Sequence, residues 1–253
     1  MLKPELLKMK AEPKGNALEI YIYSEVCPDD VDWWSGDTIP SETSAATIRD
    51  SISDHPECSE IVVYINSCGG SVQEGYGISS QLKRFDGPVT AYVDGFANSI
   101  ASVIAMAADT VKMYQNSVMM IHNVSTACWG NANQLRAEAD ALDRIMEGNR
   151  KDYLRHAKGK LDEATLIRLL DAETTLTAQM AFDLGLCDEI IDADADMEEA
   201  SAMIQREKKR YQQSRHASGL YQLAYPKEEP SQVGTENNEA DEDKVLQLLQ
   251  NFF

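Results

Sequence analysis

Apolar and polar positions change period along this chain, and the changes predict strands and helices in alternation. Short apolar runs rich in β-branched residues, bounded by turn formers, predict buried strands at 17–23, 61–65, 89–93 and 118–121. Longer segments repeat apolar residues at helical spacing and predict helices at 44–53, 72–82, 99–108, 131–156, 161–170 and 177–184. A last strand is expected within 185–192. Strands that alternate with helices predict an α/β domain.

Changes in composition divide the chain into four parts. We expect a loose arm at 1–16, one globular domain at 17–193, a polar helical extension at 194–216 and a disordered acidic tail at 217–253. The tail ends in a short apolar segment, which is either a docking element for a partner or an unstructured end. The irregular loop 27–43 carries Trp33 and Trp34, which either form a contact surface or pack over the edge of the sheet.

The predicted helix 131–156 is the longest in the chain, and one side of it is apolar. Leu135, Leu142, Met146 and Tyr153 belong to this stripe, and charged residues occupy the other side. A helix of this length on a compact domain needs a second surface for its stripe. Packing within its own subunit is expected to cover only part of it.

Charge and composition exclude several classes of function. The net charge of −19 argues against a nucleic-acid-binding surface, which needs basic residues. The longest apolar run, 100–108, is too short to span a membrane, and the first residues lack the apolar core of a signal peptide, so we expect a cytoplasmic protein. The five cysteines are odd in number and scattered, which predicts buried or half-buried thiols rather than disulfides or a metal site. No cofactor is expected.

Three turn segments carry the residues of an acyl-transfer site. Gly69 and Gly70 follow a predicted strand, where backbone N–H groups can approach an anion or a polarised carbonyl. Ser99 precedes a helix that is apolar nearly all round, and His122 ends the next strand. A lone serine before a helix is usually an N-cap, and a lone histidine after a strand is usually a packed core residue. Their combination favours a nucleophile with its general base.

Segments 64–72, 95–102 and 120–123 resemble, in order and near the same spacing, the three signature blocks of the ClpP family of serine peptidases. The resemblance extends from about residue 20 to about residue 192 and is greatest to the ClpP-type head maturation (prohead) proteases of tailed phages and prophages. It implies a ClpP/crotonase-like spiral of ββα units. It also implies that helix 131–156 is the handle through which homo-oligomeric rings stack.

The resemblance also implies roles for single residues. Ser99 is the expected nucleophile, His122 the general base and Glu173 the orienting acid, at a position where ClpP carries aspartate; Asp171 is the alternative. For the oxyanion hole we choose the backbone N–H groups of Gly70 and Ile100. Further substrate contacts are expected from Gly69, Ser71 and Asn123. Cys68 stands where the family motif normally has proline, a change that the turn should tolerate.

The resemblance implies an ATP-independent serine endopeptidase that cleaves capsid, scaffold or portal precursors during phage head maturation. The chain contains no P-loop, so any ATPase would be a separate partner. One alternative is a catalytically silent ring that serves capsid assembly, and another is a subunit of a general ATPase-coupled ClpP protease. A crotonase-like enzyme acting on acyl-CoA would not need Ser99 and His122 together. A Ser–Lys peptidase would leave His122 idle.

Overall fold

The computed structural model describes residues 12–192. The predicted helical extension and acidic tail, beyond residue 193, lie outside the described residues, as do residues 1–11. Of the predicted N-terminal arm, residues 12–14 form a strand that pairs antiparallel with the next one, which places hydrogen bonds along an otherwise open sheet edge.

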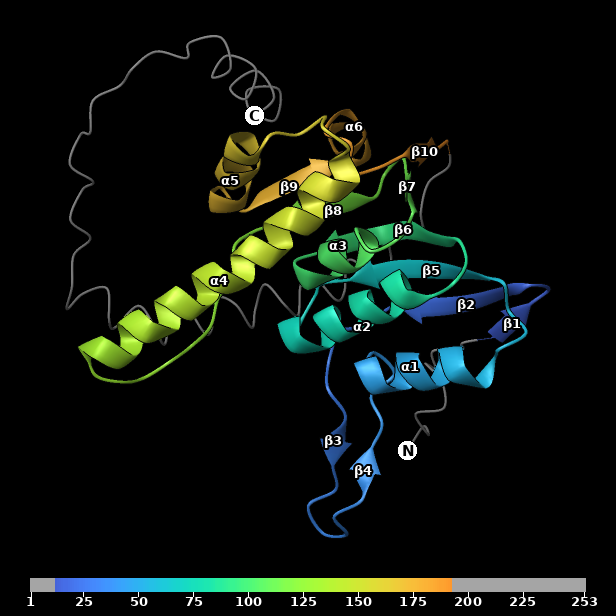
Figure 1. The fold of residues 1–253 in the computed structure, drawn as a ribbon, viewed down its shortest axis with the longest axis horizontal. Helices are drawn as coiled ribbons and strands as arrows, with labels where there is room; N and C mark the ends of the chain where they lie inside the picture. Colours follow the sequence, from blue (N-terminus) through green and yellow to red (C-terminus); the bar gives the residue numbers. More distant parts are fainter. Residues whose placement is uncertain (1–11, 193–253) are drawn as a thin grey trace. The chain divides into compact units, whose positions relative to one another are not determined.

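The core of the domain is a mainly parallel sheet (Figure 1). Its main path runs β1-β2-β5-β6-β7-β10, and β8 pairs with both β6 and β9. The strands are β1 (Glu12–Lys14), β2 (Ala17–Ile22), β5 (Glu60–Ser67), β6 (Val89–Asn98), β7 (Thr110–Tyr114), β8 (Val118–Ile121), β9 (Thr174–Thr177) and β10 (Glu189–Ile191). Among the described strands of this sheet, only the edge strand β1 and the strand β9 pair antiparallel to their neighbours.

Helices α1, α2 and α3 lie on one face of this sheet, and α4 passes across its end (Figure 1). The helices are α1 (Ala45–Asp54), α2 (Val72–Arg84), α3 (Ile100–Ala105), α4 (Ala132–Ala157), α5 (Glu163–Asp171) and α6 (Ala178–Asp183). Burial alternates along β6, with every second side chain fully buried under the helices. The predicted α/β class is therefore confirmed, together with the parallel sheet and the long helix.

Several predicted boundaries were wrong. The expected turn 94–98 continues strand β6, and the expected helix 99–108 is regular only over α3. Strands β7 and β9 were not predicted. The reason for the first error is pairing: residues 96–98 form a parallel ladder with β8, which holds the Asp94–Asn98 segment extended despite its glycine.

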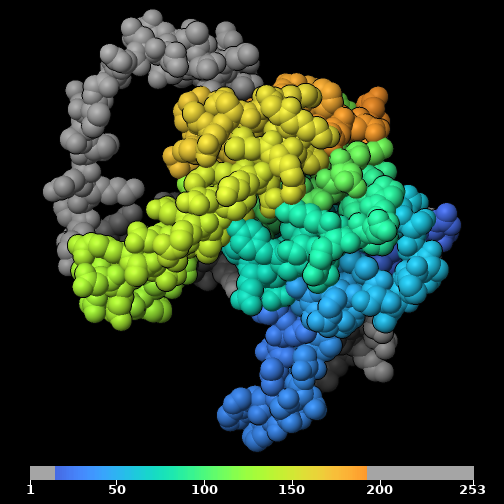
Figure 2. Space-filling view, viewed as in Figure 1, coloured from blue at the N-terminus to red at the C-terminus, as the bar shows by residue number. Residues whose placement is uncertain are grey.

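Among residues 12–192, only the second half of α4 has a packing partner. Its second half buries Met146, Asn149 and Tyr153, whereas Leu135 and Leu142 in the first half are only partly covered. That first half extends away from the sheet (Figure 2). The predicted need for another surface therefore applies to the first half alone.

A hairpin projects from the domain where the sequence predicted an irregular loop. Its two short strands are β3 (Asp30–Val31) and β4 (Thr38–Ile39), and it stands out from the body in Figure 2. At its tip Trp33 and Trp34 are 86% and 90% exposed, and their rings pack edge to face on each other. The two rings therefore do not pack over the sheet edge.

Contact between α2 and α3 requires a glycine in α2. A Cβ built on Gly75 would lie 2.1 Å from Cγ1 of Ile100, so no side chain fits there without moving one helix.

We expect Gly75→Ala to lower the free energy of unfolding by about 1–3 kcal/mol, despite the better helix propensity of alanine. Denaturant titration would measure this. The exposed α2 substitution Ser80→Ala is the matched control, and equal stability of the two variants would contradict the packing argument.

Candidate active site

The backbone at Ser99 makes a sharp turn between a strand and a helix. Its φ of 54° and ψ of −127° lie in a region that is costly for a residue with a side chain. The N–H of Ser99 donates to the carbonyl of Met120 at 2.8 Å, as the last hydrogen bond between β6 and β8. Strained turns of this kind expose the nucleophile in other hydrolases.

Ser99 does not cap its helix. At the starts of α1, α2 and α6, by contrast, Ser44, Ser71 and Thr177 accept a hydrogen bond from the first turn. The Ser99 Oγ instead lies 2.7 Å from Nε2 of His122. The structure therefore brings together the two residues that the sequence singled out, and the N-cap interpretation of Ser99 does not hold.

Strand register places Glu173 opposite His122. In the antiparallel ladder of β8 and β9, Ile121 pairs with Thr174, so the next positions outward are His122 and Glu173. Burial lowers the pKa of His122, and the negative charge of Glu173 opposes that shift, which also indicates that Glu173 lies near the ring. Glu173 has a φ of 51°, a left-handed conformation that ends α5 and starts β9.

Asp171, the alternative acid, is engaged elsewhere. Its Oδ1 accepts a hydrogen bond from Nδ2 of Asn123 at 2.7 Å. Asn123 was predicted to contact substrate, and in this structure its amide holds the end of α5. The geometry favours Glu173 over Asp171 as the group that acts on the imidazole.

Burial dominates the protonation of His122. Removal of the ring from water lowers its pKa below the usual value, and the charge of Glu173 opposes this shift without cancelling it. The imidazole is therefore neutral at neutral pH. A neutral Nε2 beside a serine hydroxyl is able to accept its proton.

The glycine turn directs backbone amides toward Ser99. Val26 forms a parallel bridge to Gly70, in which its N–H donates to Gly69 O and its carbonyl accepts from the N–H of Ser71. This pattern leaves the N–H of Gly70 on the side of the chain away from Val26. A Cβ on Gly69 would lie 2.8 Å from Cβ of Ser99 and 3.3 Å from the N of Ile100, so the turn sits directly against the serine.

The second predicted oxyanion donor is the N–H of Ile100. As the first residue of α3, Ile100 has no partner for this N–H within the helix. The sequence reasoning missed Val26, whose strand-like pairing fixes the glycine turn from the other side. The signal was weak, because a single valine next to a cysteine and a proline does not form a recognisable strand.

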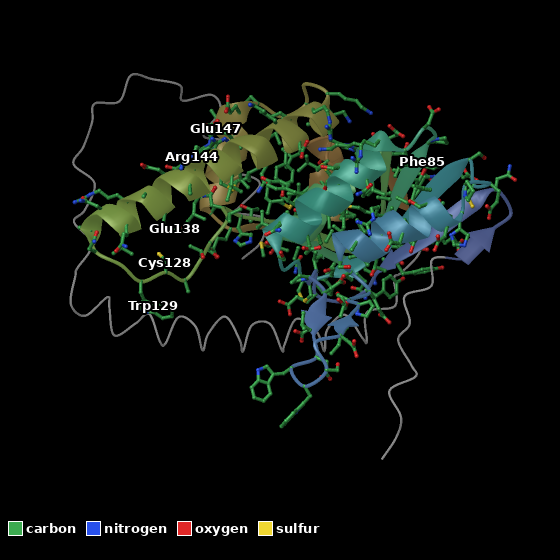
Figure 3. All side chains as sticks on the ribbon, turned by 60° about the horizontal axis from the view of Figure 1, so that its bottom comes forward. Phe85, Cys128, Trp129, Glu138, Arg144 and Glu147 are labelled. Atoms are coloured by element: carbon green, nitrogen blue, oxygen red, sulfur yellow. The ribbon has the colours of Figure 1, made fainter. Side chains whose placement is uncertain are left out.

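Among residues 12–192 no group of three or more histidine, cysteine or acidic side chains is placed to hold a metal ion. The five cysteines, all in this described part, form no disulfide. Cys128 is exposed, contrary to the prediction of buried or half-buried thiols, and lies beside Trp129 in the loop before α4 (Figure 3). In the same described part of the chain, no helix has the length and apolarity needed to cross a membrane.

Comparisons with known proteins identify the family of the chain. Residues 51–194 match the Clp protease family. The chain is 32% identical over 142 residues to the ATP-dependent Clp protease proteolytic subunit 1 of Protochlamydia amoebophila, covering 54% of this chain and 68% of that protein. The ATP-dependent Clp protease proteolytic subunit of Deinococcus radiodurans is also 32% identical over 142 residues, which are 55% of this chain and 68% of that subunit.

Among solved structures, a ClpP1 mutant from Listeria monocytogenes has the same fold, with a TM-score of 0.57 and 21% identity over 69% of this chain and 91% of that one. The matched family model and these relatives show that the chain belongs to the Clp protease family. The members of this family are serine peptidases. The named relatives are bacterial Clp subunits rather than phage prohead proteases.

The choice between the two acids can be tested without an activity assay. Glu173→Gln removes the charge that raises the pKa of His122, so we expect that pKa to fall further, because burial then acts unopposed. Asp171→Asn should leave it nearly unchanged. An NMR titration of the His122 ring measures both, and a larger shift in Asp171→Asn would reverse the assignment.

Proposed function

We propose that this protein is an ATP-independent serine endopeptidase that cleaves protein substrates through an acyl-enzyme on Ser99. The observation that carries the proposal is the 2.7 Å contact between Ser99 Oγ and His122 Nε2 at a strained strand-to-helix turn. A serine that only caps a helix would not adopt that backbone conformation.

In the first step, His122 Nε2 takes the proton of Ser99 Oγ while the oxygen attacks the scissile carbonyl. Negative charge moves to the carbonyl oxygen, where the N–H groups of Gly70 and Ile100 receive it; each such donor typically contributes about 3–4 kcal/mol. His122 then gives its proton to the leaving amine. Water hydrolyses the acyl-enzyme by the same route in reverse.

Glu173 completes the proposed triad. Its negative charge stabilises the imidazolium that forms when His122 accepts the proton, and so offsets the cost of charging a buried ring. Its carboxylate replaces the aspartate of the family motif at a position that the β8–β9 register brings beside the histidine. Gly69, Ser71 and Asn123 are the proposed lining of the substrate site.

The substrates that we propose are capsid, scaffold or portal precursors of a phage head, on the strength of the sequence resemblance. A ring of identical subunits, stacked through α4, is the proposed assembly. The relatives are named ATP-dependent subunits, which favours an ATPase-coupled protease as a second candidate. Cleavage of a folded substrate only when an unfolding ATPase and ATP are present would support that second candidate.

The decisive experiment uses a fluorophosphonate, which reacts with activated serines. We expect the wild-type protein to be labelled on Ser99, and labelling to fall by roughly 100-fold or more in Ser99→Ala and His122→Ala. Peptide mass mapping identifies the labelled residue. Ser80→Ala and His55→Ala are the matched controls and should be labelled like the wild type.

An intact, folded oligomer without labelling would favour the catalytically silent ring. A crotonase-like enzyme would likewise remain unlabelled, but it would bind acyl-CoA. Incubation of the wild type with candidate capsid precursors, read by mass spectrometry, tests the proposed substrate directly. A precursor that stays uncut by unlabelled enzyme, when a parallel sample of the same preparation reacts with the fluorophosphonate at Ser99, is excluded as a substrate.

Assembly through α4 has its own test. Leu142 belongs to the half of α4 that has little packing against the other described residues, so Leu142→Glu should weaken contact between copies and lower the mass of the assembly. Analytical ultracentrifugation measures this mass. Asp143→Ser, at an exposed neighbouring position, is the control; identical masses for both variants would remove α4 from the interface.

A further inference from the structure

We infer that Ser102 and Tyr153 are positioning residues of the oxyanion hole, acting on the peptide group that joins Ser99 to Ile100. The inference rests on the proposed function of Ser99. It concerns two side chains whose hydrogen bonds go to the Ser99 carbonyl and to each other, and which the sequence analysis did not place in the site.

The first observation is the environment of the Ser99 carbonyl. It accepts two hydrogen bonds from one residue, from Ser102 Oγ at 2.5 Å and from Ser102 N at 3.0 Å. Because a peptide group is planar, the carbonyl of Ser99 and the N–H of Ile100 move together. The groups that hold this carbonyl therefore fix the direction of the proposed oxyanion donor.

The second observation is the partner of Ser102. Its Oγ lies 2.6 Å from the hydroxyl of Tyr153 in α4. A serine hydroxyl has one hydrogen, and here it is given to the Ser99 carbonyl, so Tyr153 is the donor to Ser102. Burial raises the pKa of the Tyr153 phenol, which therefore keeps its proton.

These bonds form a chain from Tyr153 O–H to Ser102 O–H to the carbonyl of Ser99. Ser102 and Tyr153 are 0% and 2% exposed, so water does not compete for the bonds. Consecutive hydrogen bonds in a dry environment polarise one another. A polarised Ser99 carbonyl draws electrons from its own peptide nitrogen, and the N–H of Ile100 becomes a stronger donor to the developing oxyanion.

A second, partly buried tyrosine shows what a purely structural bond looks like. The hydroxyl of Tyr76 in α2 bonds to the carbonyl of Ile145 and to Oδ1 of Asn149, both in α4. It joins two helices as Tyr153 does, but its bonds end on α4 and do not reach the Ser99–Ile100 peptide. Tyr76→Phe is therefore the matched control for Tyr153→Phe.

The kinetic test compares an ester substrate with its thionoester, in which sulfur replaces the carbonyl oxygen and bonds poorly in an oxyanion hole. We expect Tyr153→Phe and Ser102→Ala to lower kcat for the ester by about two- to tenfold, with KM nearly unchanged. The thionoester should lose less, so the ester-to-thionoester ratio falls. Ser102→Thr, which keeps the hydroxyl, should restore the ratio.

Tyr76→Phe should leave the ratio at its wild-type value. The pH at which activity is half-maximal should be the same in all variants, because none of them touches His122. Equal losses for ester and thionoester in Tyr153→Phe would show a general structural role and overturn the inference. An inactive wild type that is not labelled on Ser99 would instead count against the proposed function.

A second measurement does not depend on activity. In the assembled protein labelled with nitrogen-15 isoleucine, the amide proton of Ile100 should move upfield in Ser102→Ala and in Tyr153→Phe, because its N–H is less polarised. It should not move in Tyr76→Phe. An unchanged Ile100 resonance in both of the first two variants would overturn the inference even if their activity were reduced.

Discussion

The backbone conformation of Ser99 is the constraint on which the site depends. At this positive φ the chain turns from β6 into α3, and the Oγ of Ser99 lies within hydrogen-bond distance of His122 Nε2. The same rotation turns the carbonyl inward, toward Ser102. A turn this sharp needs room beside it, and Gly69 supplies the room, since a Cβ there would lie 2.7 Å from the carbonyl oxygen of Asn98. The strained backbone of Ser99 is therefore possible only because Gly69 beside it has no side chain.

The sheet places this turn where its strands diverge. Over residues 90–93, β6 pairs with β7, and over residues 96–98 it pairs with β8. Register with β5 also shifts between Ile65 and Ser67, just before the glycine turn. Strand β6 thus ends with Ser99 beside the end of β8, where His122 lies. Strand β9 pairs with the other edge of β8 and places Glu173 next to the same end. Four chain segments distant in sequence meet by pairing rather than by side-chain attraction.

Local patterns were sufficient for the helices and the longer strands, and they singled out two candidate site residues. Ser99 precedes an apolar run and His122 follows one, and both occur in short motifs. The extension of β6 over Asp94–Asn98 could not be predicted from the sequence, because a polar segment with a glycine is typical of a turn. Pairing with β8 keeps this segment extended. Strand β9 was overlooked between two helices, although three of its four residues are threonines with high strand propensity. Without that strand, no pattern could decide between Glu173 and Asp171.

The chain of hydroxyls behind Ser99 was beyond sequence reasoning for a different reason. Tyr153 occupied a position of an apolar helical stripe and was counted there as packing. Its hydroxyl meets Ser102 only because α4 crosses the end of α3, a contact between residues 51 positions apart. Periodicity predicts which face of a helix is covered, but it does not predict which polar atom lies against it.

The exposed hairpin has a consequence for how this protein is observed. The chain has three tryptophans, and Trp33, Trp34 and Trp129 are each between 86% and 90% exposed. In the isolated chain these indoles are surrounded by water, so their fluorescence emission maximum is that of solvent-exposed tryptophan. Unfolding of the hydrophobic core therefore changes that maximum little. The same property makes these indoles sensitive to whatever covers them. A blue shift of emission in this protein reports contact at the hairpin or at the loop before α4, while unfolding is followed through the tyrosines that stack across β2, β5 and β6.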